Sequence, residues 1–337
     1  MKKLFTLLIC FPVLTLAQQT INGSITHNGL ERDYILYVPD SYSSGTSVPL
    51  VFNFHGHTSN ANEQMWYGDF RPIADTAGFI IVHPNGTLDN SGISHWNVGW
   101  GGSTVDDIGF TESLIDNLSA TYNIDNNRIY STGMSNGGFM SYQLACELSD
   151  RIAAIASVTG SMSTNWFNSC SPNHQMPIME IHGTADGTVP YTTIPSIMDF
   201  WTNFNNCNNT PIITNILNTN TNDGCTAEHK IWGDGSNGAI VEHYKIINGG
   251  HTWPGTIFLN GTTNQDINAS AKIWEFFNKY DINGLISTST AIEDNIIKNK
   301  RLVKITDILG REKNYKSNTP LFYIYDNGTV DKRIIIE

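Results

Sequence analysis

The chain has 337 residues, of which 40 % are hydrophobic and 15 % are charged. This composition supports a core larger than that of one small domain, and it excludes an intrinsically disordered protein. The formal net charge of −12 would repel phosphate backbones, so we exclude nucleic acid as a partner.

Residues 1–17 have the pattern of a secretory signal peptide. Lys2 and Lys3 precede an apolar run that ends at Leu16 and is too short for a stable membrane span. We place cleavage after Ala17, and a buried N-terminal helix is the alternative. No other stretch has the length of a membrane helix, so we expect a secreted or cell-surface protein with no membrane span in its mature chain.

Short apolar runs alternate with helical patterns between residues 18 and 282. Nearly continuous apolar strands of this kind are typical of a mostly parallel sheet that is buried on both faces. The sequence therefore predicts an α/β fold in which helices flank a central sheet, with functional groups at the carboxyl ends of the strands. We expect a hairpin over 20–39, strands over 49–55, 78–83, 128–132, 153–158, 177–182 and 239–247, and helices over 108–122, 139–148 and 269–280.

The composition changes after residue 282. Residues 283–300 begin with a small, polar stretch and are predicted to be a linker. Residues 301–337 alternate short strand-like pieces with turns at Gly310 and Asn327-Gly328, which predicts a separate small β module.

Four cysteines remain beyond the signal peptide, which contains Cys10. An even number in an exported chain indicates two disulfides, for which three pairings are possible. We favour the pairs Cys146–Cys170 and Cys207–Cys225, because each closes a short local loop. A zinc site is the alternative, but no pair has C-x-x-C spacing and no histidine lies nearby at ligand spacing.

The segment Gly133-Met134-Ser135-Asn136-Gly137 lies between an expected strand and an expected helix. A serine hydroxyl is a poor nucleophile unless a tight turn exposes it beside a base, and such a turn tolerates only small neighbours. We therefore predict that Ser135 is a catalytic nucleophile. A glycine-rich turn without catalytic function is the alternative.

A base and an acid follow the nucleophile in chain order. His251 comes directly after the strand 239–247, where it could take the Ser135 proton and return it to a leaving alcohol. Asp186 follows the strand 177–182, where it could fix the tautomer of His251. Asp223 and Asp234 are rival acids, but no strand end precedes them.

Two backbone N–H groups are predicted to hold the developing oxyanion. His55-Gly56-His57 ends the apolar run that starts at Pro49, so we assign the N–H of His57, with Thr58 as its alternative. Asn136 supplies the second donor. A metal pair at His55 and His57 is the rival hypothesis, but no third ligand follows at suitable spacing, so we expect neither a metal nor a cofactor.

Three tryptophans are candidate substrate contacts. Trp96 and Trp100 lie in a glycine-rich loop, and Trp253 follows the expected base. Aromatic faces stack on sugar or phenolic rings, so these side chains could bind a substrate. Ordinary core packing is the alternative for each of them.

These motifs together resemble secreted polyhydroxybutyrate-depolymerase-like esterases, which are akin to feruloyl and acetylxylan esterases. The resemblance covers about residues 22–280 and implies an α/β-hydrolase fold, the Ser-His-Asp triad and ester hydrolysis. The Asn-rich insert 203–223 departs from the pattern, and we expect it to reshape the entrance of the site. The resemblance rests on Val51-Phe52-Asn53-Phe54-His55-Gly56, residues 133–138, His182-Gly183-Thr184-Ala185-Asp186 and Gly249-Gly250-His251-Thr252-Trp253-Pro254-Gly255.

The tail 301–337 resembles the C-terminal sorting domain of the type IX secretion system, on residues 308–312, 327–330 and 332–337. This implies the type IX secretion machinery as a partner, and a small carbohydrate-binding module is the alternative.

The sequence as a whole predicts a secreted serine carboxylic ester hydrolase that acts on polysaccharide-linked esters, with feruloyl or acetyl as the acyl group. A polyhydroxyalkanoate depolymerase is the second choice. A serine peptidase with the same triad and a non-catalytic surface carbohydrate-binding protein are further alternatives.

Overall fold

The computed structural model describes residues 19–259, 261–286, 302–307, 311, 321–325 and 330–333. The chain divides into two compact units, Met1–Leu285 and Ile286–Glu337. The expected signal peptide 1–17 lies outside the described residues, as do most of the expected linker 283–300 and the turns predicted at Gly310 and Asn327-Gly328. No helix in the described part of the chain is long and apolar enough to cross a membrane.

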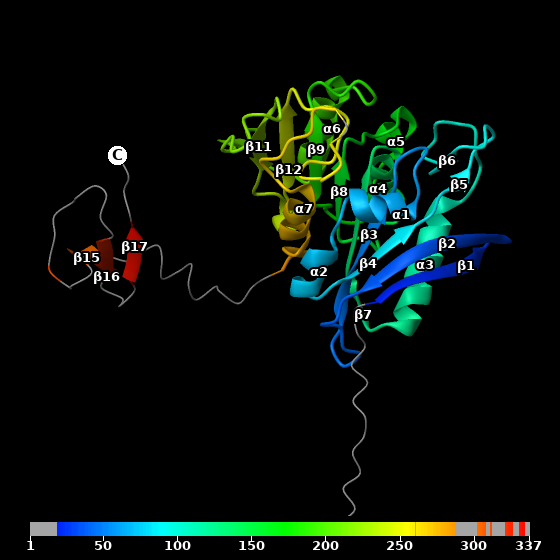
Figure 1. The fold of residues 1–337 in the computed structure, drawn as a ribbon, viewed down its shortest axis with the longest axis horizontal. Coiled ribbons are helices and arrows are strands. Elements are labelled where there is room, and N and C mark those ends of the chain that lie inside the picture. The colour runs from blue at the N-terminus through cyan, green and yellow to red at the C-terminus, as the bar shows by residue number, and fades with distance from the viewer. Residues whose placement is uncertain are drawn as a thin grey trace, which may run out of the picture. The chain divides into compact units, whose positions relative to one another are not determined.

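A ten-stranded sheet forms the frame of the first unit (Figure 1). Side chains of successive strand residues point to opposite faces, so a strand covered on both faces is mostly apolar, and β3 is buried at every position. Its strands are β1 (Gln19–His27), β2 (Leu30–Val38), β3 (Val48–Phe54), β4 (Ile80–Pro84), β7 (Ile124–Met134), β8 (Ala154–Val158), β9 (Ile178–Gly183), β10 (Ile212–Asn215), β11 (Thr226–Trp232) and β12 (Val241–Ile247).

The strand order is β1-β2-β4-β3-β7-β8-β9-β12-β11-β10. The strands from β4 to β12 in this order are parallel to one another. The hairpin β1–β2 and the strands β11 and β10 extend the two edges in antiparallel fashion. The predicted mostly parallel sheet is therefore confirmed, and every strand and helix expected from the sequence is present with small shifts of its ends.

Helices cover both faces of the sheet, and each face has its own apolar core. One core contains residues of α3, α4 and α6, and the other contains residues of α2 and α7. The helices are α1 (Ala61–Tyr67), α2 (Arg71–Ala77), α3 (Asp107–Thr121), α4 (Asn136–Glu147), α5 (Thr164–Ser169), α6 (Ile194–Phe204) and α7 (Ala269–Phe277), with short 3₁₀ turns at Tyr191–Thr193 and Ser236–Gly238.

The smaller sheets lie outside this frame. The pair β5 (Thr87–Leu88) and β6 (Ser94–His95) and the pair β13 (Tyr280–Asp281) and β14 (Gly284–Leu285) are short hairpins of the first unit. In the second unit, β15 (Leu302–Thr306), β16 (Leu321–Tyr325) and β17 (Val330–Arg333) form an antiparallel sheet, in agreement with the expected small β module.

One of the two expected disulfides is confirmed. Cys146 and Cys170 are bonded to each other, whereas Cys207 and Cys225 are free and buried, so the prediction of a Cys207–Cys225 bridge was wrong. The reason is the sheet between them: Cys207 packs in the core on one face and Cys225 in the core on the other. Closeness in sequence did not bring them together, because the chain between them passes through the edge strand β10.

The state of the cysteines can be mapped by alkylation and peptide mass spectrometry. Unfolding without reductant should expose thiols at Cys207 and Cys225 only, while Cys146 and Cys170 should react after reduction alone. In the native protein, burial raises the pKa of each free thiol to about 11, so both should react slowly at neutral pH. A linked Cys207–Cys225 peptide would contradict this assignment.

Candidate active site

The predicted catalytic residues follow strands that end at the same edge of the sheet. Ser135 follows β7, Asp186 follows β9, His251 follows β12 and His57 follows β3. Because these strands are parallel neighbours, their carboxyl ends meet. The topology therefore gathers side chains from distant parts of the sequence at one edge.

Ser135 occupies a strained turn between β7 and α4. Its φ is 55° and its ψ is −119°, a conformation that costs a residue with a side chain on the order of 1–3 kcal/mol. A Cβ on Gly133 would lie 2.6 Å from the carbonyl oxygen of Phe54, and one on Gly137 would overlap the same carbonyl group. The two glycines are therefore required by the close approach of β3 to the turn.

His251 and Asp186 form a hydrogen-bonded pair. The Nδ1–H of His251 donates to Asp186 Oδ2 at 2.7 Å, which leaves Nε2 without a proton and able to accept one. The other carboxylate oxygen of Asp186 accepts the backbone N–H groups of Thr188 (2.8 Å) and Val189 (2.9 Å). The rival acid Asp223 instead accepts the backbone N–H of Gln265.

A second histidine lies behind the acid, buried between two carboxylates. His182 contacts Glu180 Oε1 through Nδ1 at 2.9 Å, and its Nε2 lies 2.9 Å from Val189 O and 3.4 Å from Asp186 Oδ2. Tyr142 donates its hydroxyl to the other oxygen of Glu180 at 2.9 Å. This arrangement links Glu180, His182, Asp186 and His251 in one row, of which the first three members are buried.

Opposite charges in this row shift the pKa values of its members. Burial lowers the pKa of His182, but hydrogen bonds to Asp186 and Glu180 outweigh it and raise that pKa to about 9. Burial raises the pKa of Asp186, but hydrogen bonds from His182 and His251 hold it well below its usual range. Asp186 is therefore ionised across the neutral range, as an orienting carboxylate must be.

Sequence reasoning missed the roles of His182 and Glu180. The available signal was their spacing, because residues that lie two positions apart on a strand point to the same face, here of β9.

The two expected oxyanion donors are the backbone N–H groups of His57 and Asn136. Asn136 is the first residue of α4, where backbone N–H groups have no partner within the helix. Thr58, the alternative to His57, donates its N–H to Ser94 O at 2.9 Å and is thereby excluded. His57 remains the candidate from this loop.

The side chain of Asn136 fixes the loop that contains Trp96. Its Oδ1 accepts the N–H of Trp96 at 2.6 Å and its Nδ2 donates to Trp96 O at 3.1 Å. The indole N–H of Trp96 donates to His55 O at 2.9 Å. The two strand ends that carry the oxyanion donors are thus joined through one tryptophan.

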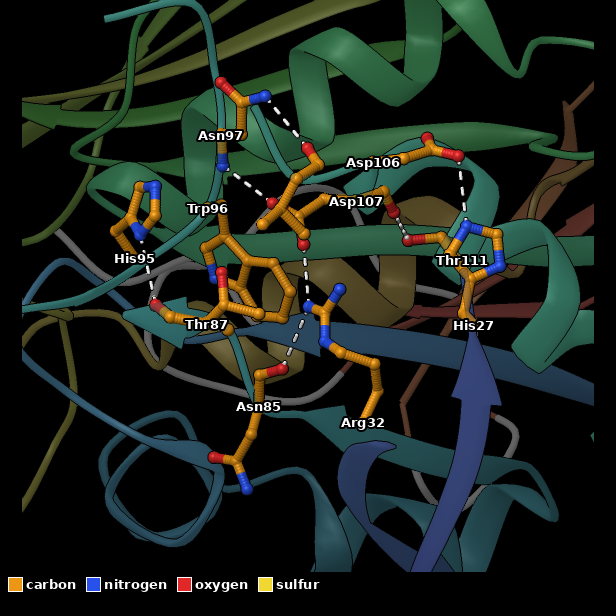
Figure 2. A network of polar contacts seen from close by, with 12 residues as sticks. His27, Arg32, Asn85, Thr87, His95, Trp96, Asn97, Asp106, Asp107 and Thr111 are labelled. Atoms are coloured by element: carbon orange, nitrogen blue, oxygen red, sulfur yellow. Dashed lines mark hydrogen bonds and ion pairs between the residues drawn. The ribbon is translucent and has the colours of Figure 1, made fainter. Parts of the chain in front are cut away.

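A buried ion pair supports the same loop from below (Figure 2). Arg32 donates to Asp107 Oδ1 at 2.6 Å and to Asn85 O at 3.2 Å, and both charged side chains are buried. The second oxygen of Asp107 accepts the N–H of Asn97 at 2.7 Å. The guanidinium also lies 3.9 Å from the centre of the Phe110 ring, so packing as well as charge holds it.

The rival metal hypothesis at His55 and His57 conflicts with the contacts of His55. Its Nδ1 lies 2.7 Å from Gly56 O and its Nε2 accepts the N–H of Gly86 at 2.9 Å. Burial lowers the pKa of this ring to about 4, so it is neutral and structural. No group of three or more His, Cys, Asp or Glu side chains in the described residues could hold a metal ion.

The prediction of a substrate contact was wrong for two of the three tryptophans. Trp96 and Trp253 are 0 % and 1 % exposed, and they pack in the cores that support the site. Trp100 is 50 % exposed and lines a cavity next to Ser135. Trp66, which the sequence analysis did not select, is 48 % exposed and lines a second cavity at the same serine.

Ser135 and His57 line both cavities, which therefore adjoin each other at this serine. The first has a volume of about 640 Å³ and the second about 540 Å³. None of the residues lining either cavity belongs to the insert 203–223, so the expectation that it reshapes the entrance was wrong; it forms β10 at the sheet edge instead. The first is lined by Trp100, Phe139, Met162, Val189 and Pro190, and the second by His251, Ser59, Asn62, Glu63, Trp66, Tyr67 and Phe258, among others.

The strand order and the serine turn between β7 and α4 define an α/β-hydrolase fold. The chain is similar to the solved acetyl xylan esterase from Aspergillus awamori, with a TM-score of 0.55 and 16 % identity over 78 % of this chain and 99 % of that chain. A sequence family described as Phospholipase/Carboxylesterase matches residues 104–215.

Two curated relatives carry more specific names. The chain is 26 % identical over 272 residues to the bifunctional acetylxylan esterase/xylanase XynS20E of Neocallimastix patriciarum, covering 80 % of this chain and 36 % of the relative. It is 27 % identical over 201 residues to feruloyl esterase D of Neurospora crassa, covering 56 % of this chain and 64 % of the relative. The alignments thus span less than two thirds of either relative.

The charge on His182 predicts a pH-dependent stability. A histidine whose folded pKa of about 9 exceeds its unfolded value of about 6.5 stabilises the fold fully below pH 6.5, and loses this effect as the pH rises through 9. His182→Gln should therefore lower the free energy of unfolding by about 3 kcal/mol at pH 6 relative to wild type, and the difference should shrink towards pH 9.5. Urea denaturation at several pH values measures it.

His243→Gln is the matched control. His243 is buried on the neighbouring strand β12, and burial lowers its pKa to about 3, so it is neutral throughout this range. Since only the unfolded form takes up a proton near pH 6.5, its loss should cost a nearly constant amount of stability, smaller at pH 6 than at pH 9.5 by less than about 1 kcal/mol and so opposite in trend to His182→Gln. The same response from His182→Gln would show that His182 carries no charge.

Proposed function

We propose that this protein is a serine carboxylic ester hydrolase that acts on polysaccharide-linked esters. The observation that carries the proposal is the hydrogen-bonded Asp186–His251 pair, whose histidine lines the same cavity as a serine held in a strained turn. The names of the curated relatives support the polysaccharide ester as substrate class.

In this mechanism Ser135 Oγ attacks the ester carbonyl while His251 Nε2 takes its proton. The N–H groups of His57 and Asn136 hold the oxyanion, and each donor contributes about 10²–10³ in rate. His251 then gives the proton to the leaving alcohol, and the acyl group remains on Ser135. Water activated by His251 hydrolyses this acyl-enzyme, and Asp186 stabilises the imidazolium in both steps.

The larger cavity supports an aromatic acyl group. Beside several hydroxyls its lining includes the apolar side chains of Trp100, Phe139, Met162 and Val189, which suit a phenolic ring. An acetyl group would fill only a small part of its roughly 640 Å³. Of the two acyl groups expected from the sequence, feruloyl therefore fits this cavity better than acetyl. Polyhydroxybutyrate, the second choice of substrate, should be tested alongside.

Replacing the nucleophile should abolish ester hydrolysis. Ser135→Ala should lower kcat for methyl ferulate by about 10⁶ while the protein stays folded, because the acyl-enzyme cannot form. A serine-directed phosphonate should inactivate the wild type, and EDTA should not. Activity of Ser135→Ala within tenfold of wild type would refute the proposal.

The pair His251→Ala and His57→Ala separates side-chain chemistry from backbone chemistry. His251→Ala should match Ser135→Ala, whereas His57→Ala keeps its backbone N–H and should cost far less. Equal losses, or inactivation by EDTA, would favour a metal site at His55 and His57. Acetylated xylan, polyhydroxybutyrate and a peptide substrate in the same assay test the alternative activities.

We further propose that the chain is exported, with residues 1–17 as signal peptide and 301–337 as a type IX sorting domain. Support comes from the sequence resemblance and from the separate antiparallel sheet β15–β17.

Deleting residues 283–337 tests the sorting proposal. In a bacterium with a type IX system, the truncated enzyme should be active but retained in the periplasm, because its address is missing. Esterase assays on cell fractions measure this. Normal appearance of the truncated enzyme in the medium would favour a carbohydrate-binding module.

A further inference from the structure

The cavity of about 540 Å³ that His251 lines is also lined by the exposed Trp66 and by the polar residues Ser59, Asn62 and Glu63. We propose that it is a carbohydrate subsite for the alcohol half of the ester, in which Trp66 stacks on a sugar ring. The inference rests on the proposed function and specifies where the polysaccharide binds.

Proton transfer decides which half of the ester enters which cavity. The leaving oxygen must receive its proton from His251, so the alcohol lies on the side of that ring. Of the two cavities at Ser135, the one of about 540 Å³ is lined by His251 and the one of about 640 Å³ is not. The acyl group then extends towards Trp100, and the alcohol extends towards α1.

Trp66 is exposed and yet held in place. It lies near the end of α1, and the guanidinium of Arg71 covers its ring at 3.9 Å from the centroid. Asp69 fixes that guanidinium with two hydrogen bonds of 2.9 and 2.8 Å. Because the ring is already immobilised, stacking on a sugar costs little side-chain entropy.

Polar groups with free hydrogen-bonding capacity accompany this ring. Asn62 lies one turn before Trp66 on α1, and residues four apart share a helix face. Within the described residues the amide of Asn62 makes no side-chain hydrogen bond, whereas Ser59 Oγ donates to Glu63 Oε2 at 2.7 Å. Amide, hydroxyl and carboxylate groups beside an aromatic ring match the hydroxyls and the apolar face of a sugar.

Asn62 also lines a third cavity, of about 520 Å³, which continues the polar surface away from the serine. Three further asparagines, Asn22, Asn60 and Asn85, line it together with Ser24 and Asp33. The amide of Asn22 has no hydrogen-bond partner in the described part of the chain. A glycan that extends beyond its esterified sugar would meet hydrogen-bonding groups here, beside the side chains of Tyr34 and Ile35.

The test compares two esters with the same acyl group, methyl ferulate and a feruloylated arabinoxylan trisaccharide. Trp66→Ala should lower kcat/KM for the trisaccharide ester about three- to tenfold more than for methyl ferulate, mainly through KM, because only the first ester has a sugar to stack. Trp66→Phe should recover part of the difference. Ethyl acetate and an acetylated xylotriose form the equivalent pair if acetyl esters are the better substrates.

Two further variants serve as controls for this comparison. Trp100→Ala, in the other cavity, should lower kcat/KM for both feruloyl esters equally, because both share the acyl group. Ile213→Ala, on the exposed edge strand β10, should change neither. If Trp66→Ala lowers kcat/KM equally for both feruloyl esters, or for neither, the subsite is refuted. If the wild type hydrolyses none of the four esters, the proposed function itself is refuted.

Discussion

The strained turn at Ser135 is the constraint on which the rest of the site depends. The left-handed φ of 55° directs the serine out of the sheet edge and starts α4 with its N–H groups beside it. The turn requires a close approach of β3 to β7. Gly133 and Gly137 have no side chains that would clash with the Phe54 carbonyl group, so this approach is possible. The parallel sheet supplies the rigidity that sustains the strain, because both strands are buried and hydrogen-bonded on both sides.

Buried charges then fix the loops that the sheet alone leaves free. Desolvation makes an isolated buried charge costly, so each charge in this site has an opposite partner and further hydrogen bonds. Arg32 and Asp107 hold the backbone at Asn97, and His182 holds Asp186 from behind. Such pairs add little net stability over apolar packing, but they admit one geometry only.

The sequence was informative where a single local rule determines the outcome. Strands buried on both faces are mostly apolar, and functional groups in a parallel sheet follow strand ends, so the frame and the positions of Ser135, Asp186 and His251 after strand ends could be predicted together. The burial of individual side chains could not be predicted in this way. Trp96 and Trp253 are near the site in sequence but face the cores, while Trp66 faces a cavity. The pairing of Cys207 failed for the same reason, since sequence distance does not tell which face of a sheet a residue joins.

The loop between β3 and α1 connects binding to catalysis. It carries the candidate oxyanion donor at His57, is tied to Ser94 through the N–H of Thr58, and ends at Asn60, whose side chain caps α1 by accepting the N–H of Glu63. Trp66 follows within the same short helix. A sugar that stacks on Trp66 would contact a helix that begins four residues after His57, so binding energy from the remote part of a substrate can be used to position the candidate oxyanion donor in the transition state.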